Sequence, residues 1–342
     1  STLYVSLLVS EEEVTDVARS HQWDFSNMNF LELPAALIES GPQEQTVFRP
    51  AEVELDEVTQ HIIDAIEKHQ PKRLVIDSLS ELQLLVDSSR QLRSQMIKIK
   101  HAVMKRPCTT ILTAGESVVE DYPTYQTIVQ GALRLSSTTP SYGEPRRQLE
   151  ILKMRGSDFL GGRHDLVIRT GGLRVHPRIS VSLDSAEACD MVSSGNEGLD
   201  HLFGGGLAAG SSCLIMGTSG AGKTTMTAMY ASHMLQHGEA ISVYTMDESR
   251  RTYMHRAGSL GLDLQPYVDS GQLRLRDYPV GELNLGRFLT ELKQDVDQRG
   301  IRMMVLDSLS GFFQLAGGDS LAGCKLHEIL RYLSANGVLS LT

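Results

Sequence analysis

Residues 210–230, GSSCLIMGTSGAGKTTMTAMY, carry the strongest structural signal in this chain. A short apolar run at 213–216 predicts a buried strand, and the stretch that begins at Lys223 predicts a helix. Between them lies the complete G-x-x-x-x-G-K-[ST] pattern, in the strand–loop–helix context that a phosphate-binding loop requires. The alternative, a Gly/Ser turn that happens to precede a helix, leaves the full pattern and its flanks unexplained. The sequence therefore predicts a site for a nucleoside triphosphate.

The residues of this loop have distinct expected roles. Backbone N–H groups of the glycine-rich turn can surround a polyphosphate, and the helix N-terminus adds its partial positive charge. Lys223 can reach the terminal phosphates, and the Thr224 hydroxyl can ligate a Mg²⁺ ion that also holds the nucleotide. The predicted nucleotide-binding residues are Gly217, Thr218, Ser219, Gly220, Ala221, Gly222, Lys223, Thr224 and Thr225. ATP and Mg²⁺ are the expected cofactors.

Length and composition narrow the class of protein. The 342 residues suggest two domains, and 41% hydrophobic with 22% charged residues is ordinary for a globular protein. No run of 18 apolar residues predicts a membrane span, and the first residues resemble a core strand and not a signal peptide, so a cytoplasmic location is expected. The net charge of −10 argues against a protein that binds duplex DNA by broad charge neutralisation.

Strands and helices alternate in both halves of the chain. In the first half, strands are predicted at 3–9, 29–33, 72–78 and 109–113, with helices at about 10–20, 55–69 and 88–106. In the second half, strands are predicted at 240–246, 272–278, 302–306 and 338–342, with helices at about 249–260, 282–299 and 320–335. This alternation predicts an α/β fold with mostly parallel central sheets, and residues 131–178 predict an additional β-rich segment.

Two segments of the chain match closely, RLVIDSLSE at 73–81 and MMVLDSLSG at 303–311, which lie 230 residues apart (307 − 77 = 230). A second pair, WDF at 23–25 and LDL at 262–264, gives a similar separation (263 − 24 = 239). Agreement in order, spacing and flanking helices indicates an internal duplication of a whole domain. The predicted domains are 1–178 and 192–342, joined by a linker at 179–191.

Each predicted domain contains a part that the other lacks. The stretch 192–247, with its phosphate loop, has no counterpart before the first strand of domain one. Residues 115–178 likewise have no counterpart after the last strand of domain two. We therefore expect both domains to be incomplete in this chain, with the phosphate loop of the first domain before Ser1 and the rest of the second domain after Thr342.

Carboxylates follow the predicted strands of the second domain. Asp307 ends an apolar strand and fits the Walker B role, in which an aspartate holds Mg²⁺. Asp247 and Glu248 end the strand after the phosphate-loop helix, where a carboxylate can orient or deprotonate an attacking hydroxyl or water. The alternative for this pair is a favourable charge at a helix N-terminus, since Ser249 could cap the next helix. We predict catalytic roles for Asp247 and Glu248 and metal-binding roles for Thr224 and Asp307.

Together, these motifs resemble those of KaiC-like ATPases of the RecA superfamily. The resemblance rests on SGNEGLD at 194–200, the glycines at 204–206, GTSGAGKTT at 217–225, MDES at 246–249, LDSLSG at 306–311 and LEILKMRG at 149–156. It covers essentially the whole chain, and the tandem arrangement with the LKMRG motif makes it more specific than the phosphate loop alone. It implies two tandem RecA-like P-loop NTPase domains, hexameric rings with ATP bound between subunits, slow ATP hydrolysis and, in clock members, Ser/Thr autophosphorylation in the second ring.

The resemblance also implies roles at single positions. In the family, the pair at Lys153 and Arg155 reaches the γ-phosphate of the neighbouring subunit, as a catalytic finger supplied in trans. These residues lie two apart on a predicted strand and so share a face; the alternative is a strand edge protected by charge. The family's following His falls on Phe159. In the first domain the family's catalytic glutamate pair falls on Leu8 and Val9, so we expect that site to hydrolyse nucleotide poorly.

Several functions are compatible with these features. The first is an ATP-hydrolysing, oligomeric signalling or clock-type ATPase, with Ser/Thr autokinase activity as an extension; its expected partners are copies of itself in a homo-hexamer and regulatory proteins. The second is a RecA/RadA-type DNA-dependent ATPase, a recombinase or helicase, because basic residues line the predicted helix 88–106. No aromatic residues interleave there for base stacking, so nucleic acid is disfavoured as a partner. The third is a nucleotide-bound scaffold with little turnover.

Overall fold

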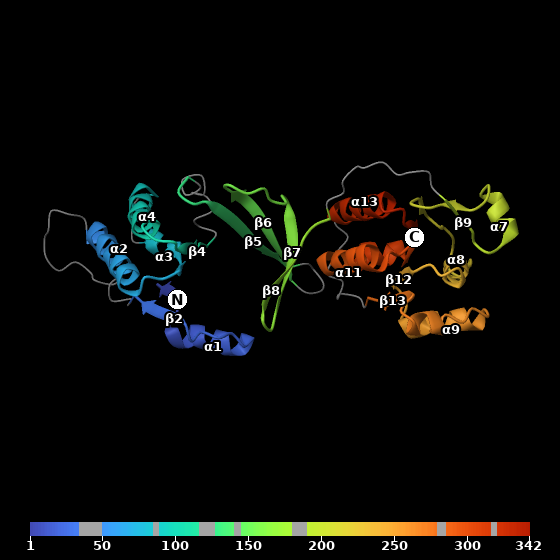
Figure 1. Cartoon of the computed structure of the whole chain (residues 1–342), viewed down its shortest axis with the longest axis horizontal. Coiled ribbons are helices and arrows are strands. Elements are labelled where there is room, and N and C mark those ends of the chain that lie inside the picture. The colour runs from blue at the N-terminus through green and yellow to red at the C-terminus, as the bar shows by residue number, and fades with distance from the viewer. Residues whose placement is uncertain are drawn as a thin grey trace. The chain divides into compact units, whose positions relative to one another are not determined.

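The computed structural model describes residues 1–33, 50–84, 89–115, 127–139, 145–179, 190–278, 285–315 and 320–342. Its first parallel sheet has the strand order β2 (Met28–Glu32), β1 (Thr2–Ser6), β3 (Arg73–Asp77) and β4 (Thr109–Leu112). The helices of this part are α1 (Glu11–His21), α2 (Pro50–His69), α3 (Leu79–Leu84) and α4 (Ser89–Met104) (Figure 1). Apolar side chains of the strands, α2 and α4 form one core cluster, which includes Leu3, Val5, Val58, Ile62 and Leu92.

A second parallel sheet has the order β11 (Ser212–Cys213), β15 (Leu339–Leu341), β14 (Met303–Asp307), β12 (Ile241–Thr245) and β13 (Leu273–Asp277). Core clusters lie on both of its faces. One joins the sheet to α8 (Lys223–Gln236) and α9 (Arg250–Ser259), and the other joins it to α11 (Leu285–Arg299) and α13 (Ser320–Ala335). Because both faces are covered, every residue of β12 is buried and β14 is apolar up to its final aspartate, as is typical of a buried parallel sheet.

Shorter elements complete this part. They are α7 (Glu197–Leu202), α10 (Gln265–Asp269), α12 (Leu309–Leu315) and the antiparallel pair β9 (Met191–Val192) and β10 (Leu207–Ala208).

The two sheets repeat one arrangement. The order β2-β1-β3-β4 in the first corresponds to β13-β12-β14-β15 in the second. Strand registers correspond as well, because Ser6 lies opposite Asp77 as Thr245 lies opposite Asp307. Each aspartate is the last residue of its strand. The predicted α/β fold with mostly parallel sheets is confirmed, and the shared strand order and register support the internal duplication.

A four-stranded sheet lies between the two parallel sheets in the sequence. Its order is β5 (Gly131–Thr138), β6 (Arg146–Met154), β7 (Arg163–Arg169) and β8 (Gly172–His176), with β6 and β7 antiparallel. The chain divides into two compact units, Ser1–Leu133 with Ile151–Leu160 and Ile168–Leu173, and Arg134–Glu150 with Gly161–Val167 and Arg174–Thr342. This sheet contributes to both. Residues 180–189 of the predicted linker lie outside the described residues, and the predicted boundaries at 178 and 192 stay predictions.

The strand before the phosphate loop is shorter and more open than predicted. β11 comprises only two residues, and the side chains of Leu214 and Met216 are 52% and 82% exposed. β11 stands at the end of the strand order, with β15 beside it. Within the described residues its other side is therefore open, as at any sheet edge. The prediction of a buried strand at 213–216 was wrong for this reason.

Candidate active site

The phosphate loop turns through two glycines in the left-handed region. Gly220 has a φ of +81° and Gly222 a φ of +96°, conformations that residues with a Cβ rarely adopt. Gly222 is the N-cap of α8 and supplies no side-chain hydrogen bond to the helix end. The first amides of α8 therefore stay available to an external acceptor, and the helix dipole favours an anion there. The predicted loop 217–225 has the local geometry of a phosphate site.

Lys223 is the first residue of α8, and its side chain folds back over the loop. Its Nζ atom donates to the carbonyl oxygens of Gly217, at 2.8 Å, and Thr218, at 3.0 Å. These contacts hold the ammonium group above the turn. A phosphate oxygen is a stronger, charge-assisted acceptor than a carbonyl, so the ammonium can exchange these partners for a bound polyphosphate.

Thr224 and Asp307 meet at the base of the loop. The Thr224 hydroxyl donates to Oδ2 of Asp307 at 2.7 Å, which joins the start of α8 to the end of β14. Both side chains offer hard oxygens, the kind of ligand that Mg²⁺ prefers. Within the described parts of the chain, no three His, Cys, Asp or Glu side chains gather as a metal cage. One or two protein oxygens completed by phosphates and waters is the usual Mg²⁺ arrangement, so these residues fit that ion.

Glu248 follows β12, the strand next to β14, and its side chain is only 14% exposed. Burial raises the pKa of Glu248 above its ordinary value; the Arg256 guanidinium opposes this shift, and the nearby Asp307 and Asp247 carboxylates add to it. Arg256, on α9, forms an ion pair and hydrogen bond with Oε2 of Glu248. A carboxylate with a raised pKa beside a phosphate site is suited to accept a proton during catalysis.

Asp247 is exposed but closely held. It accepts a hydrogen bond from the hydroxyl of Ser308, the residue after Asp307, and that hydroxyl also accepts from the backbone N–H of Gly311 at 3.1 Å. A Cβ at Gly311 would lie 2.7 Å from Oδ1 of Asp247, so only glycine fits this contact. Sequence reasoning missed Ser308 and Gly311 as partners of Asp247, although both lie in the LDSLSG motif. It also missed Arg256, which no motif marks.

A cavity of about 260 Å³ opens beside these groups. It is lined by the end of β14, by the segment after β11 and by the phosphate loop, with Lys223, Asp307 and Ser308 among its residues. The structure thus brings together the loop lysine, the predicted metal-binding pair and, through Ser308, the predicted catalytic Asp247. All of these residues belong to one compact unit.

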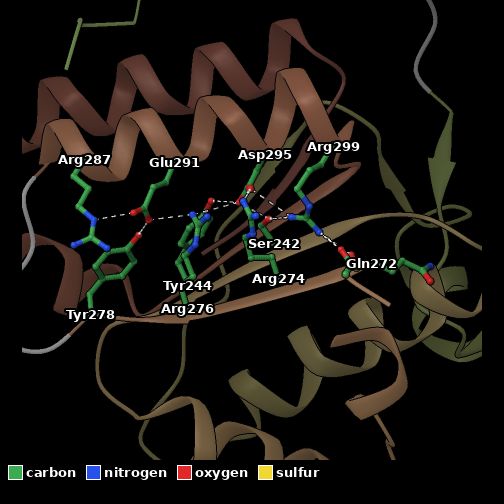
Figure 2. A network of polar contacts seen from close by, with 11 residues as sticks. Ser242, Tyr244, Gln272, Arg274, Arg276, Tyr278, Arg287, Glu291, Asp295 and Arg299 are labelled. Atoms are coloured by element: carbon green, nitrogen blue, oxygen red, sulfur yellow. Dashed lines mark hydrogen bonds and ion pairs between the residues drawn. The ribbon is translucent and has the colours of Figure 1, made fainter. Parts of the chain in front are cut away.

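A separate charged network joins α11 to the strands on the opposite face of this sheet (Figure 2). At its centre Asp295 is fully buried and accepts hydrogen bonds from the hydroxyls of Ser242 and Tyr244, each at 2.7 Å. Three arginines form ion pairs with Asp295: Arg274, Arg276 and Arg299. Glu291 extends the network through Tyr278, Arg276 and Arg287. Through these contacts the network ties α11 to β12 and β13.

Lys153 and Arg155 lie in the other unit. β6 ends at Met154, so Lys153 is in the strand and Arg155 begins the following turn. The Lys153 Nζ donates to the carbonyl of Val129 at 3.1 Å, and the Arg155 amide donates to Gln130 at 2.9 Å. Desolvation lowers the pKa of Lys153, and the charges of Arg155 and Lys100 lower it further. The predicted role of this pair in trans stays a prediction.

Comparison with known proteins gives consistent matches along the chain. A family profile described as "ATPase: KaiC" matches residues 1–180 and 192–342. The circadian clock oscillator protein KaiC of Acaryochloris marina is 25% identical over 313 residues, 90% of this chain and 59% of the relative.

Two further relatives show the same level of similarity. KaiC of Parathermosynechococcus lividus is 25% identical over 80% of this chain and 51% of its own length. The circadian clock protein KaiC3 of Synechocystis sp. is 26% identical over 76% of this chain and 52% of its own length. The chain therefore spans between half and three fifths of the length of these relatives.

None of the helices in the described residues is long and apolar enough to cross a membrane.

Proposed function

The chain belongs to the KaiC family of ATPases, and we propose that its second repeat binds ATP with Mg²⁺ and hydrolyses it as a KaiC-like, clock-type signalling ATPase. The observation that carries this proposal is the 2.7 Å contact between Thr224, at the start of the phosphate-loop helix, and Asp307, at the end of β14. It sets the loop against β14, and Glu248 follows the neighbouring strand, β12. Loop, metal-binding oxygens and base therefore come from three adjacent elements.

In this mechanism the loop amides and Lys223 hold the phosphates in place. Thr224 and Asp307 would hold Mg²⁺, which when bound neutralises charge on the phosphoryl oxygens. Glu248 accepts the proton of the attacking water, and its low exposure limits competition from bulk solvent. Ser308 fixes Asp247 beside it through the hydroxyl hydrogen bond. Positioning and electrostatic stabilisation supply most of the rate enhancement in phosphoryl transfer, and these contacts provide both.

For the assembled protein we propose homo-hexameric rings in which Lys153 and Arg155 of one copy face the nucleotide of the next. The support is the gathering of three cations, Lys100, Lys153 and Arg155, together with family membership. A Ser or Thr hydroxyl could replace water as the acceptor at the same site, which would make the protein an autokinase. Labelled phosphate retained on the protein after incubation with γ-labelled ATP distinguishes this reaction from hydrolysis.

The DNA-dependent alternative loses part of its basis in α4 and in the residues just after it. Lys98 pairs with Asp56 at 2.7 Å, Lys100 donates to the carbonyl of Ile128, and Arg106 donates to that of Ile66. These side chains therefore have partners within the fold. Salt-dependent binding of single-stranded DNA, with stimulation of ATP hydrolysis, would favour the recombinase or helicase interpretation over ours.

The function is tested by phosphate release from ATP by the full-length protein, with a Lys223→Ala variant and an exposed control, Lys105→Ala. We expect Lys223→Ala to lose turnover at the second site by at least about 100-fold, because its ammonium group contacts the transferred phosphate. Chelation of Mg²⁺ should have the same effect, and the control should match the wild type. A wild-type protein that binds ATP without measurable turnover would instead indicate a nucleotide-bound scaffold.

A further inference from the structure

Arg256 contacts the proposed base without belonging to any motif of the site. It lies in α9, and its guanidinium binds Oε2 of Glu248. The Arg256 side chain is 45% exposed whereas that of Glu248 is 14% exposed. The arginine end of the pair is open to water, and such partly exposed ion pairs contribute little to stability, so stability alone gives a weak reason for this contact.

The first repeat contains the same turn, which allows a comparison position by position. In the second repeat the Thr245 hydroxyl donates to the carbonyl of Glu248 at 2.8 Å. In the first, the Ser6 hydroxyl donates to the carbonyl of Val9 at 2.5 Å. Since Ser6 and Thr245 have matching registers opposite Asp77 and Asp307, Val9 occupies the position of Glu248.

The helices that follow these turns also match. Ser10 caps α1 and Ser249 caps α9 with nearly the same dihedral angles, φ −73° and ψ 159° against φ −72° and ψ 153°. Seven residues after the cap, α1 has Val17 and α9 has Arg256, so these two residues occupy equivalent positions.

Both partners of the Glu248–Arg256 pair are therefore valine in the first repeat. The same turn and the same capped helix form there without the ion pair, so the backbone does not require it. The arginine is present in the repeat that has the glutamate and absent from the one that lacks it. This joint difference ties Arg256 to the chemistry of Glu248 and not to the fold.

We propose that Arg256 is a positioning residue for phosphoryl transfer, which holds Oε2 of Glu248 and leaves Oε1 directed to the attacking hydroxyl or water. This inference rests on the proposed function of the second site. A guanidinium–carboxylate contact is charge-assisted and directional, so it fixes the carboxylate more firmly than solvent would. A general base must lie within hydrogen-bond reach of the proton that it abstracts, and its orientation decides whether it does.

The electrostatic surroundings support the same role. Glu248 faces Asp307 from β14, Asp247 from its own turn, and Tyr253 and Arg256 from α9. Burial and the two aspartates favour the protonated form of Glu248, which cannot act as a base. Arg256 is the cation that opposes them and so favours the ionised form.

The test compares Arg256→Met, Arg256→Lys and the control Arg251→Met in full-length protein, with kcat and KM for ATP measured for each. Arg251 is exposed on the same helix. We expect Arg256→Met to lower kcat by about tenfold or more with KM nearly unchanged, because the base is misaligned while phosphate binding is untouched. Arg256→Lys should restore part of kcat, and Arg251→Met should match the wild type.

A double-mutant cycle separates positioning from direct contact with the nucleotide. In a Glu248→Gln background, residual phosphate release from γ-labelled ATP should be the same whether or not the Arg256→Met change is also present, because Arg256 acts only through Glu248. A full additional loss in that background would overturn the inference, as would an Arg256→Met variant that keeps or raises kcat while its thermal unfolding matches the wild type. A wild type without ATPase activity would overturn the proposed function and this inference together, whereas an active wild type with an unaffected Arg256→Met overturns the inference alone.

Discussion

The helices α2 and α11 cover equivalent faces of the two parallel sheets, but they meet their strands through different chemistry. In each repeat three residues separate the end of the helix from the start of the sheet's central strand, so Ala65 of α2 corresponds to Asp295 of α11. The strand positions of Ser242 and Tyr244 correspond to Leu3 and Val5 in the first repeat. One interface is therefore apolar, and the other contains the buried network of Figure 2.

This difference separates what the fold requires from what has been added to it. The first repeat shows that apolar contacts are sufficient for this helix-on-sheet packing. Burying an ion pair costs desolvation that its attraction only partly offsets, so the network around Asp295 is no simple gain in stability. The network does make the packing of α11 on the sheet depend on the presence of all its members. The strand ends differ in the same manner, since Leu8 and Val9 occupy the positions of Asp247 and Glu248.

The largest loss of stability is expected when a charged residue is introduced into the apolar interface between α2 and the first sheet. Ala65→Asp puts a carboxylate into the apolar cluster of α2, and the nearby Arg106 already donates to the carbonyl of Ile66. We expect a loss of about 4 kcal/mol or more in the free energy of unfolding, because the charge is buried without a partner. Trp23, the only tryptophan, lies in this unit, so its fluorescence in urea reports the change. An unchanged transition midpoint would contradict the comparison.

A smaller but still large loss is expected when the network loses its centre. Asp295→Ala leaves Arg274, Arg276 and Arg299 without their common partner. We expect the free energy of unfolding to fall by about 3 kcal/mol. This is at the low end for a broken buried ion pair, because all three arginines keep some access to water. Hydrogen exchange of the β12 amides measures the effect locally. The conservative Asp295→Glu variant, which keeps the charge, serves as a control. If the β12 amides of Asp295→Ala were as protected from exchange as those of the wild type, the network would not stabilise this interface.

Replacing four members of the network together should lower the free energy of unfolding less than Asp295→Ala alone does. Ser242→Leu, Tyr244→Val, Arg276→Leu and Asp295→Ala together install the residues that the first repeat has at these four positions, which are Leu3, Val5, Leu31 and Ala65. Asp295 is then removed together with Arg276 and with both of its hydroxyl partners, so fewer buried polar groups are left unpaired, and we expect at least about 1 kcal/mol less destabilisation than in Asp295→Ala alone. The same exchange experiment measures it. Costs that simply add up would show that the four residues act independently.

Much of this fold could be predicted from sequence because its signals are local. The strand–loop–helix around 217–225 and the repeated DSLS segment each depend on near neighbours in the chain, as does the Ser10 cap of α1. The edge position of β11 could not be predicted from the four apolar residues at 213–216, since exposure there depends on which strand lies alongside. A buried aspartate on α11 likewise resembles any polar position until the arginines of β13, distant in sequence, are placed against it.

The residues of the candidate site also differ in whether the sequence could predict their roles. The roles proposed for Lys223, Thr224 and Asp307 follow from motifs with fixed spacing, and the structure places the last two in contact. Ser308 holds Asp247 across two strands, and Arg256 reaches Glu248 from a helix. Such partners are set by tertiary geometry, so one sequence without the fold gives no means to choose them.

The smallest effect is expected where the repeats agree. Ser249→Ala and Ser10→Ala each remove a side-chain acceptor from a helix N-terminus, which serves the amide of Thr252 in one case and that of Glu13 in the other. We expect the loss of each cap to lower the free energy of unfolding by about 1 kcal/mol. Unfolding followed by Trp23 fluorescence for Ser10→Ala, and by hydrogen exchange for Ser249→Ala, gives the two values. A difference between them well above about 1 kcal/mol would show that the two turns are less alike than their dihedral angles indicate.

We propose that the second repeat performs the hydrolysis because it alone, of the two described strand ends, carries the carboxylate pair. Steady-state phosphate release by full-length Glu248→Gln tests it most directly, with Val9→Gln as the matched change in the first repeat. We predict that Glu248→Gln loses nearly all turnover, at least about 100-fold, while it still binds ATP, and that Val9→Gln retains wild-type turnover. Substantial residual hydrolysis in Glu248→Gln, within about tenfold of the wild type, would contradict the account.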